Sequence, residues 1–398
     1  MSLSVAPDRS RPLLILLVWL AGLGAAAQFG KVAVALHVWG AQYPVSPSGL
    51  GFIVSSVGLC GLVFGVAAGV IVDRFGLRRS IVLGLATGGL LSLLQASLPP
   101  YPVLIGLRLV EGAAHLLIVV AGPVLMSAHA SERARPAAMT LWSTFFGVSY
   151  MLVAFISVPV VARFGPGGLL VGHGIYMLVM AAILWRAMPV PIPRERAPAL
   201  TVSEWVEVHR RIYRSPWISA PGLGFVFYTL MYVAALAFLP GFVSEPIRPA
   251  MASVMPLASI ALSLTAGIFV LRFLEPIRVV QLGFALVAMS TIPLLLADTD
   301  KGFFLAAVLL MSVSAFCAGG SFASLASLNT DLTDRAHATG ALAQMGNVGT
   351  STGAPILAWL IATYGLNGFV GFTLFLSLAG ILMHGWLARR RRLSTFRG

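Results

Sequence analysis

The sequence holds little charge and almost no cysteine, and each shortage excludes a class of protein. Charged residues make up 10% of the 398 residues and hydrophobic residues 58%, and the mean hydropathy is +0.93. Soluble domains of this size carry far more charge, so we expect a membrane protein. The two cysteines, Cys60 and Cys317, lie in apolar runs with no His or Cys at ligand spacing. This pattern excludes a disulfide framework and a metal site and leaves both as packing residues.

Other signatures are missing as well. No stretch resembles a nucleotide-binding loop, which argues against direct ATP coupling, and we expect no cofactor. The spans offer no nucleophile or metal constellation at a geometry that would serve catalysis, so we do not expect an enzyme. The first apolar run follows Arg9 and Arg11 and has no small-residue cleavage site. We therefore expect it to be a retained span and not a leader.

Long apolar runs dominate the rest of the chain. A bilayer core takes about 20 apolar residues per helix, and on that basis the sequence divides into twelve spans, near residues 13–37, 49–72, 80–98, 102–126, 138–161, 168–187, 218–242, 251–273, 279–297, 302–326, 338–362 and 367–387. Loops are short except for the connector at 188–217. We expect an all-α membrane protein with an N-terminal six-helix half at 1–190, a cytoplasmic linker at 191–217 and a C-terminal six-helix half at 218–398.

The basic residues indicate the orientation of these spans. Of the 26 Lys and Arg residues, only Arg163, Arg248 and Lys301 fall in outer loops when both termini are cytoplasmic. That distribution follows the positive-inside rule. The formal net charge of +13 is spread over many inner segments, and we therefore expect no nucleic-acid partner.

The linker contains a pattern that is typical of a short helix. Thr201 and Glu204 fit a capping box, and Trp205, Val208 and Ile212 recur at helical spacing. We expect this helix to lie on the inner membrane surface and to tether the two halves. A partner-docking role stays open as the alternative.

The most informative stretch is GVIVDRFGLRR, residues 69–79, between the second and third spans. One glycine allows close helix approach and the other a tight reversal. The pattern Gly-x-x-x-Asp-Arg-x-Gly-x-Arg-Arg resembles the loop signature of the major facilitator superfamily. With twelve spans and a central inner loop, the resemblance covers essentially the whole chain. The matching residues are Gly69, Asp73, Arg74, Gly76, Arg78 and Arg79.

This resemblance implies two six-helix halves around a central cavity that alternates between outward-open and inward-open states. In family terms, Asp73, Arg74 and the rest of the motif belong to an inner-face latch between the halves. The alternative is that they only cap a helix and follow the positive-inside rule. A worn repeat of the motif, GIFVLR at 267–272, supports the two related halves.

Span four carries three ionisable groups on one face. Arg108, Glu111 and His115 stand at i, i+3 and i+7, a spacing that nearly closes two helical turns. Arg108, Glu111 and Gly112 resemble the family pattern Arg-x-x-Gln-Gly, with a glutamate at the glutamine position. A carboxyl group can gain or lose a proton, so we expect Glu111 and His115 to couple transport to protons.

Span one carries a lysine at matching depth. Lys31 and Arg108 both lie about 9 Å from the outer boundary by helical rise. The resemblance implies that spans one, four, seven and ten line the cavity. We therefore expect Lys31, Arg108 and Gln28 to face one water-filled space and bind the substrate, since a cation in lipid is costly.

Each of these groups also has a structural alternative. Lys31 could snorkel to the headgroups, and Arg108 and Glu111 could form an ion pair that only holds span four. A lone intramembrane histidine such as His115 is often a hydrogen-bonded packing residue. His173 has no charged neighbour on its own face and is a weaker candidate.

The second half offers hydrogen bonds in place of charge. The interiors of its spans carry no acidic or basic residue, but Tyr228 and Tyr232 stand at i, i+4 on span seven, and Gln344 and Asn347 form an amide pair on span eleven. We expect both tyrosines to contact the substrate, although such pairs also serve in packing. Positive charge from one half and hydrogen bonds from the other favour an anion or a zwitterion.

Together these features predict a secondary transporter for a small organic anion or zwitterion. We expect alternating access, proton coupling, and a monomer that spans the inner membrane of a bacterial-type cell. Proton-driven export of drugs or metabolites is the second hypothesis, weakened because span five has Gly147 alone where drug antiporters of the family carry a glycine- and proline-rich motif. A membrane sensor on a transporter scaffold is the third, and it lacks an output domain.

Overall fold

The protein is helical throughout the residues that the computed structural model describes, which are 10–33, 36–45, 47–189 and 201–395. The N-terminal group of helices is α1 (Pro12–Ala33), α2 (Leu36–Gln42), α3 (Pro47–Phe75), α4 (Leu77–Gln95), α5 (Tyr101–His129), α6 (Arg135–Ser143) and α7 (Phe145–Ala187). The linker helix is α8 (Val202–Arg214). The C-terminal group is α9 (Ala220–Phe238), η1 (Leu239–Phe242), α10 (Arg248–Leu262), η2 (Ser263–Gly267), α11 (Ile268–Val270), α12 (Pro276–Leu296), α13 (Asp300–Leu328), α14 (Leu332–Tyr364) and α15 (Leu366–Thr395).

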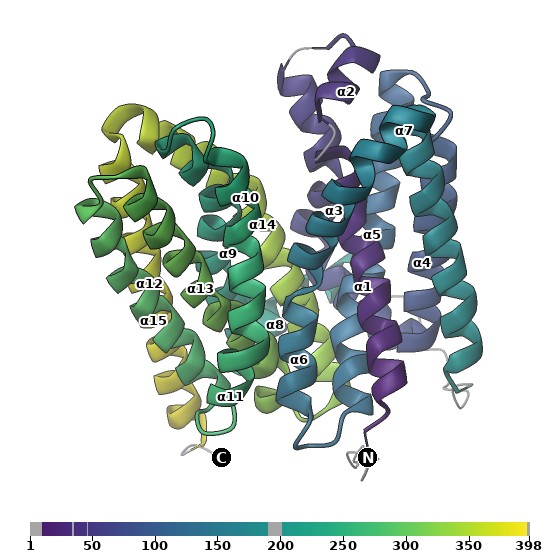
Figure 1. Ribbon diagram of the computed structural model, residues 1–398. Coiled ribbons are helices and arrows are strands. Elements are labelled where there is room, and N and C mark those ends of the chain that lie inside the picture. The colour runs from purple at the N-terminus through teal and green to yellow at the C-terminus, as the bar shows by residue number, and fades with distance from the viewer. Residues whose placement is uncertain (1–9, 34–35, 46, 190–200, 396–398) are drawn as a thin grey trace.

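These helices form the expected twelve-span architecture. Eleven spans within the described ranges are long and apolar enough to cross a bilayer. The twelfth, α14, is 33 residues long but rich in Gly, Thr, Ser, Asn and Gln, so it is polar for a membrane helix. Figure 1 shows the two groups side by side, with the start of α1 and the end of α15 on the same side of the molecule. The twelve-helix fold predicted from the sequence is confirmed.

The two halves are joined on the inner side and separate on the outer side. One large buried cluster contains inner residues of both halves, among them Val66 and Leu116 with Leu325 and Leu342. The outer ends have two separate clusters, one built from α1 to α7 and one from α9 to α15. A core that is continuous only at the inner side describes an outward-open state.

The inner contact between the halves depends on close approach of α3 and α14. A Cβ on Gly69 would lie 2.7 Å from the Ala336 carbonyl oxygen, and a Cβ on Gly65 would lie 2.7 Å from the Gln344 Cα. Gly340 on α14 meets the same stretch from the other side. Only glycine leaves room for two backbones at this separation.

Two places in the helices stand out. The reversal between spans five and six lies within α7 at Gly165, where the backbone leaves the helical conformation with a φ of +67° and a ψ of −179° that suit glycine. Span eight contains a π-helical turn, η2, next to the worn repeat of the motif. π-Turns are often found at functional sites, and Gly267 in this turn packs near Thr140 of α6 in the opposite half.

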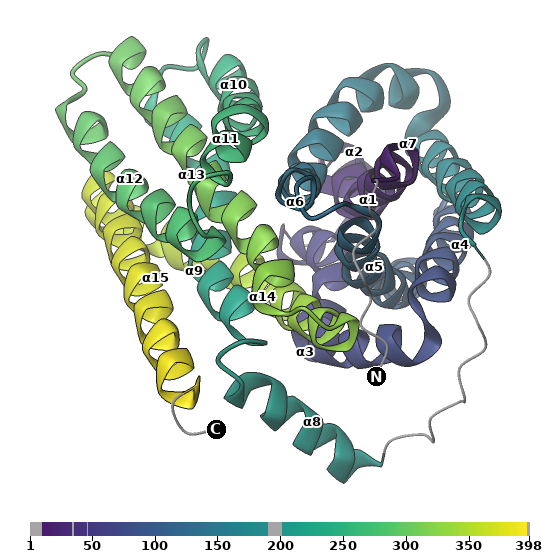
Figure 2. The same cartoon turned by 90° about the horizontal axis from the view of Figure 1, so that it is seen from below.

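The linker helix α8 has the predicted capping box and contacts the helical core. Thr201 Oγ1 accepts from the Glu204 N–H, and Glu204 in turn accepts from the Thr201 N–H. Ile212 is fully buried against the protein core, and Trp205 and Tyr213 pack against the same core. The helix lies beside α3 and α14 (Figure 2), and this part of its apolar face contacts protein. Burying that part against protein removes it from water.

Candidate functional site

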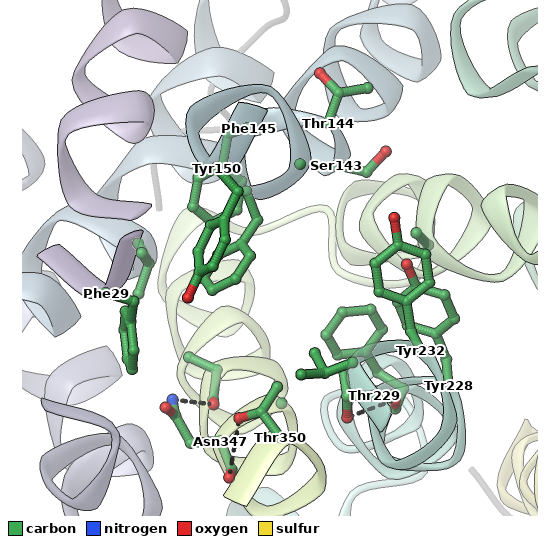
Figure 3. A pocket seen from close by; sticks show the side chains of 18 of the residues that line it. Phe29, Ser143, Thr144, Phe145, Tyr150, Tyr228, Thr229, Tyr232, Asn347 and Thr350 are labelled. Atoms are coloured by element: carbon green, nitrogen blue, oxygen red, sulfur yellow. Dashed lines mark hydrogen bonds between the residues drawn. The ribbon is translucent and has the colours of Figure 1, made fainter. Parts of the chain in front are cut away.

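A cavity of about 280 Å³ lies between the two halves, on the outer side of their contact. One wall is aromatic and comes from the N-terminal half, with Phe29 and Tyr150 facing the cavity, and the opposite wall presents Tyr228 and Tyr232 of α9 (Figure 3). The remaining aromatic lining residues are Trp142, Phe145, Phe146, Phe225 and Phe322. A flat aromatic ring in the cavity could pack against side chains of both walls.

Polar groups of the cavity are mostly uncharged. Asn347 and Thr350 of α14 and Thr229 of α9 contribute amide and hydroxyl groups to it. His115 is the one lining side chain, among the residues that the structure describes, that can change its charge near neutral pH. Recognition in the cavity therefore relies on ring contacts, hydrogen bonds and one imidazole.

Behind the N-terminal wall lies a buried cluster of charges. Lys31 Nζ donates to Glu111 Oε1 at 2.6 Å and to Ser92 Oγ at 2.9 Å, and it lies 3.4 Å from His173 Nδ1. His173 Nε2 donates to the Gly24 carbonyl at 3.0 Å, so neutral His173 offers Nδ1 as an acceptor. All three N–H groups of the ammonium thus have partners.

Glu111 links the lysine to the arginine of span four. Arg108 Nη1 donates to Glu111 Oε2 at 2.7 Å, and Gln95 Nε2 donates to the same oxygen at 2.9 Å. The two cations and the amide hold the carboxylate in its charged form. Lys31, Arg108 and Glu111 together carry a net charge of +1 inside the half.

His115 connects this cluster with the cavity. Its Nδ1 donates to the Ala25 carbonyl at 3.0 Å and lies 3.2 Å from Gln28 Oε1. A carbonyl can only accept, so Nδ1 carries the hydrogen and Nε2 is the nitrogen that can take a proton. The Gln28 carbonyl accepts from Arg108 Nη1 at 2.7 Å. Gln28 therefore joins the His115 imidazole to the charge cluster.

The structure corrects the expected position of the cations. Lys31 is 1% exposed, and Arg108 and Gln28 are fully buried, so they do not face the cavity in this conformation. Each finds its partners on neighbouring helices, which shield it from both water and lipid. His115, Tyr228 and Tyr232 do line the cavity, as expected.

The motif residues take different positions at the inner face. Asp73 Oδ1 accepts a 2.8 Å hydrogen bond from Thr333 Oγ1 of the opposite half. Arg78 donates to the Trp185 carbonyl and stacks on that indole ring, so it holds α4 to α7 within one half. Gly76 has a φ of +83° at the turn into α4, and Arg79 is exposed.

Arg74 lies near the linker helix. The Thr201 backbone and side chain lower the pKa of Glu204 by hydrogen bonding, and the nearby charge of Arg74 lowers it further. This relationship places Arg74 within electrostatic reach of α8.

Several residues at these sites were missed from the sequence. Ser92 and Gln95 complete the charge cluster together with His173, the weaker candidate of the sequence. All three come from other helices, where spacing along one helix gives no signal. Arg335 donates to Ser127 Oγ of the opposite half at 2.9 Å. The charged run at 331–337 could have indicated this second inner contact, but the expected span began after it.

The chain belongs to the major facilitator superfamily. The family model described as Major Facilitator Superfamily matches residues 14–245, and the twelve-helix fold agrees with it. The protein is therefore a multi-pass membrane transporter of a family that handles small-molecule substrates.

Known proteins of this family are similar to the chain to different degrees. It is 30% identical over 179 residues to the 4-hydroxybenzoate transporter PcaK of Pseudomonas aeruginosa, an alignment that covers 44% of this chain and 39% of that protein. The human organic anion transporter MFSD10 has a TM-score of 0.77 at 15% identity, with 93% of this chain and 98% of that chain covered. The transporter FucP in its outward conformation has a TM-score of 0.73 at 12% identity, covering 94% and 98%. The two structures show the shared fold.

Proposed function

We propose that the protein is a secondary transporter that moves a small organic anion or zwitterion with an aromatic ring by alternating access. The observation that carries this proposal is the cavity of about 280 Å³ with aromatic walls. This volume is near the lower end of the range of about 300–1,000 Å³ for small-molecule sites. A single ring with one or two polar substituents fits it, and the partial similarity to PcaK supports an aromatic acid.

The positive cluster behind the wall supports a negatively charged substrate. Lys31 and Arg108 outnumber Glu111 by one charge, and no acidic residue lines the cavity within the described ranges. Field lines in an enclosed, weakly polar site are screened little, so the cluster and Gln28 favour an anion in the cavity, beside Tyr228 and Tyr232. We propose that the substrate site consists of Lys31, Arg108, Gln28, Tyr228 and Tyr232.

Proton coupling in this proposal depends mainly on His115. Its Nε2 can take a proton from the cavity. The positive charge that results would act on Gln28, whose Oε1 lies 3.2 Å from Nδ1, and on the charge cluster. Glu111 contributes by holding both cations. We further propose that transport is coupled to protons across a bacterial-type inner membrane, that the protein is a monomer, and that the motif at 69–79 is the latch.

The test uses purified protein in liposomes with a trapped pH dye. Adding 4-hydroxybenzoate should move protons with the solute, and a pH gradient should drive its accumulation without chemical change. His115→Gln should lose accumulation while it retains exchange, whereas His384→Gln, a buried histidine outside the cavity lining, should keep both. Equal accumulation in the His115 variant would contradict the coupling assignment.

The second candidate is proton-driven export of a neutral aromatic compound. The uncharged aromatic lining favours it, because such a surface also accepts a ligand without a carboxylate. Countertransport of protons with 4-hydroxybenzamide, and none with 4-hydroxybenzoate, would support this candidate and contradict the first.

A further inference from the structure

Arg108 retains a donor without a partner. Its Nε donates to the Ile53 carbonyl at 3.0 Å, and its Nη1 to Gln28 and Glu111. Nη2 has no hydrogen-bond partner among the described residues, although the whole side chain is buried. A buried charged donor without a partner is costly, so this nitrogen marks a place where an acceptor would be stabilised.

The guanidinium with the free donor is held by backbone that also carries part of the cavity wall. The two carbonyls that hold Arg108 belong to Gln28 and Ile53, and the next residues along the chain, Phe29 and Val54, line the cavity. Side chains of the wall, Phe29 among them, therefore stand between the guanidinium and the cavity. Gln28 Nε2 is a second buried donor without a partner in the described structure.

Phe29 is the movable part of this layer. Its ring meets His115 edge-on at 5.1 Å between centroids and lies 5.9 Å from the Phe146 ring. These contacts are apolar or weakly polar, and no hydrogen bond must break when the ring turns. Rotation about χ1 between staggered wells would move the ring into the cavity space.

We propose that Phe29 is a partition that covers a carboxylate subsite at Arg108 Nη2. This proposal rests on the proposed function and extends it, because it names where the charged end of the substrate goes. The aromatic ring stays between the walls, Phe29 turns aside, and the carboxylate accepts from Nη2. The added negative charge would then balance the +1 of the cluster.

The first experiment compares an acid with its amide in binding to purified protein. Calorimetry with 4-hydroxybenzoate and 4-hydroxybenzamide gives the ratio of their dissociation constants. Phe29→Ala, with Phe29→Leu as a milder variant, should raise the preference for the acid about tenfold, the size of one charge-assisted hydrogen bond. Phe146→Ala on the same wall should leave the preference unchanged. An equal ratio in the Phe29 and Phe146 variants, or a gain that persists with Arg108→Gln, would overturn the proposal.

The second experiment does not depend on the substrate. In a Cys60→Ser, Cys317→Ser background, Gln28→Cys places a thiol behind the partition. An anionic methanethiosulfonate should react about tenfold faster when Phe29→Ala is added, and a cationic one should gain less. Equal gains, or the same gain with Phe146→Ala, would contradict the subsite. If neither aromatic compound binds any variant, the aromatic-acid function fails, and the labelling rates alone decide whether the subsite exists.

Discussion

Thr333 donates a 2.8 Å hydrogen bond to Asp73 across 260 residues of sequence and joins the inner ends of the two halves. Thr333 is in the first turn of α14, which Asp331 caps. The Asp73 carboxylate therefore also lies at the positive end of a helix dipole. The proposed inner latch combines a hydroxyl donor with a helix terminus.

Thr333→Val should weaken this latch without changing shape or net charge. Loss of one hydrogen bond to a half-exposed carboxylate costs about 1–2 kcal/mol, which corresponds to a population shift of about 5- to 30-fold toward the inward-open state. The distance between spin labels at Arg79 and Arg278, measured by electron–electron double resonance, checks this.

Two variants frame that measurement. Thr330→Val is the control, since Thr330 contributes only its carbonyl, to Arg335. Asp73→Asn should shift the population as Thr333→Val does and reduce flux with folded protein still in the membrane. Unchanged label distances and flux in both latch variants would remove the latch role.

Glu111→Gln should be the most destabilising change in the charge cluster. It leaves two buried cations without an anion, and an unpaired buried charge costs about 3–5 kcal/mol. Arg108→Gln should cost less, because Lys31 and Glu111 remain as a balanced pair. Thermal unfolding in detergent gives the order, with Glu275→Gln, an exposed carboxylate, as the control. A smaller loss for Glu111→Gln than for Arg108→Gln would contradict the charge balance described above.

Gly65→Ala should open the inner contact between α3 and α14. Its Cβ would lie within 2.7 Å of the Gln344 Cα, an overlap that costs about 1–3 kcal/mol. Gly106→Ala, where a Cβ meets nothing within 4 Å, should be neutral or mildly stabilising in its helix. Thiol-labelling rates at inner positions, faster only in the first variant, would support this seam as the inner gate.

Tyr213→Phe should weaken the attachment of the linker helix α8 to the inner contact between α3 and α14. Tyr213 Oη donates to Gln344 Oε1 at 2.6 Å, and Gln344 Nε2 donates to the Leu62 carbonyl at 2.9 Å. Burial raises the pKa of the Tyr213 phenol, so the donor stays protonated at neutral pH. Losing it costs about 1 kcal/mol and should accelerate inner opening, read from the same spin labels. Tyr364→Phe, an exposed tyrosine at the other end of α14, should have no effect.

Much of the fold could be predicted because the bilayer imposes a simple length rule. The twelve spans, the capping box of α8 and the turn at Gly76 each depend on local sequence. The exact residue of the turn between spans five and six could not be predicted, since Gly165, Gly167 and Gly168 equally suit it. The contact of α8 with α3 and α14 could not be predicted, because an amphipathic helix can bury its apolar residues against lipid or protein, and only the packed structure shows the protein contact.

The candidate site was less predictable for a related reason. The matched depth of Lys31 and Arg108 did bring them to one carboxylate, Glu111. In our proposal, Phe29 decides whether that cluster faces the cavity, and the neighbours of Phe29 come from three helices. Helical periodicity gives the face of one helix and no information on which side chain of another covers it.

The polar character of α14 has a consequence for biogenesis. A helix with so many small and polar residues gains little from entering hydrocarbon alone, so it is expected to be retained in the bilayer only once α9 and α3 offer it a surface. The α14 segment would then have to stay near the insertion machinery until the helices of the first half have assembled. Maturation of the transporter would be limited by its eleventh crossing.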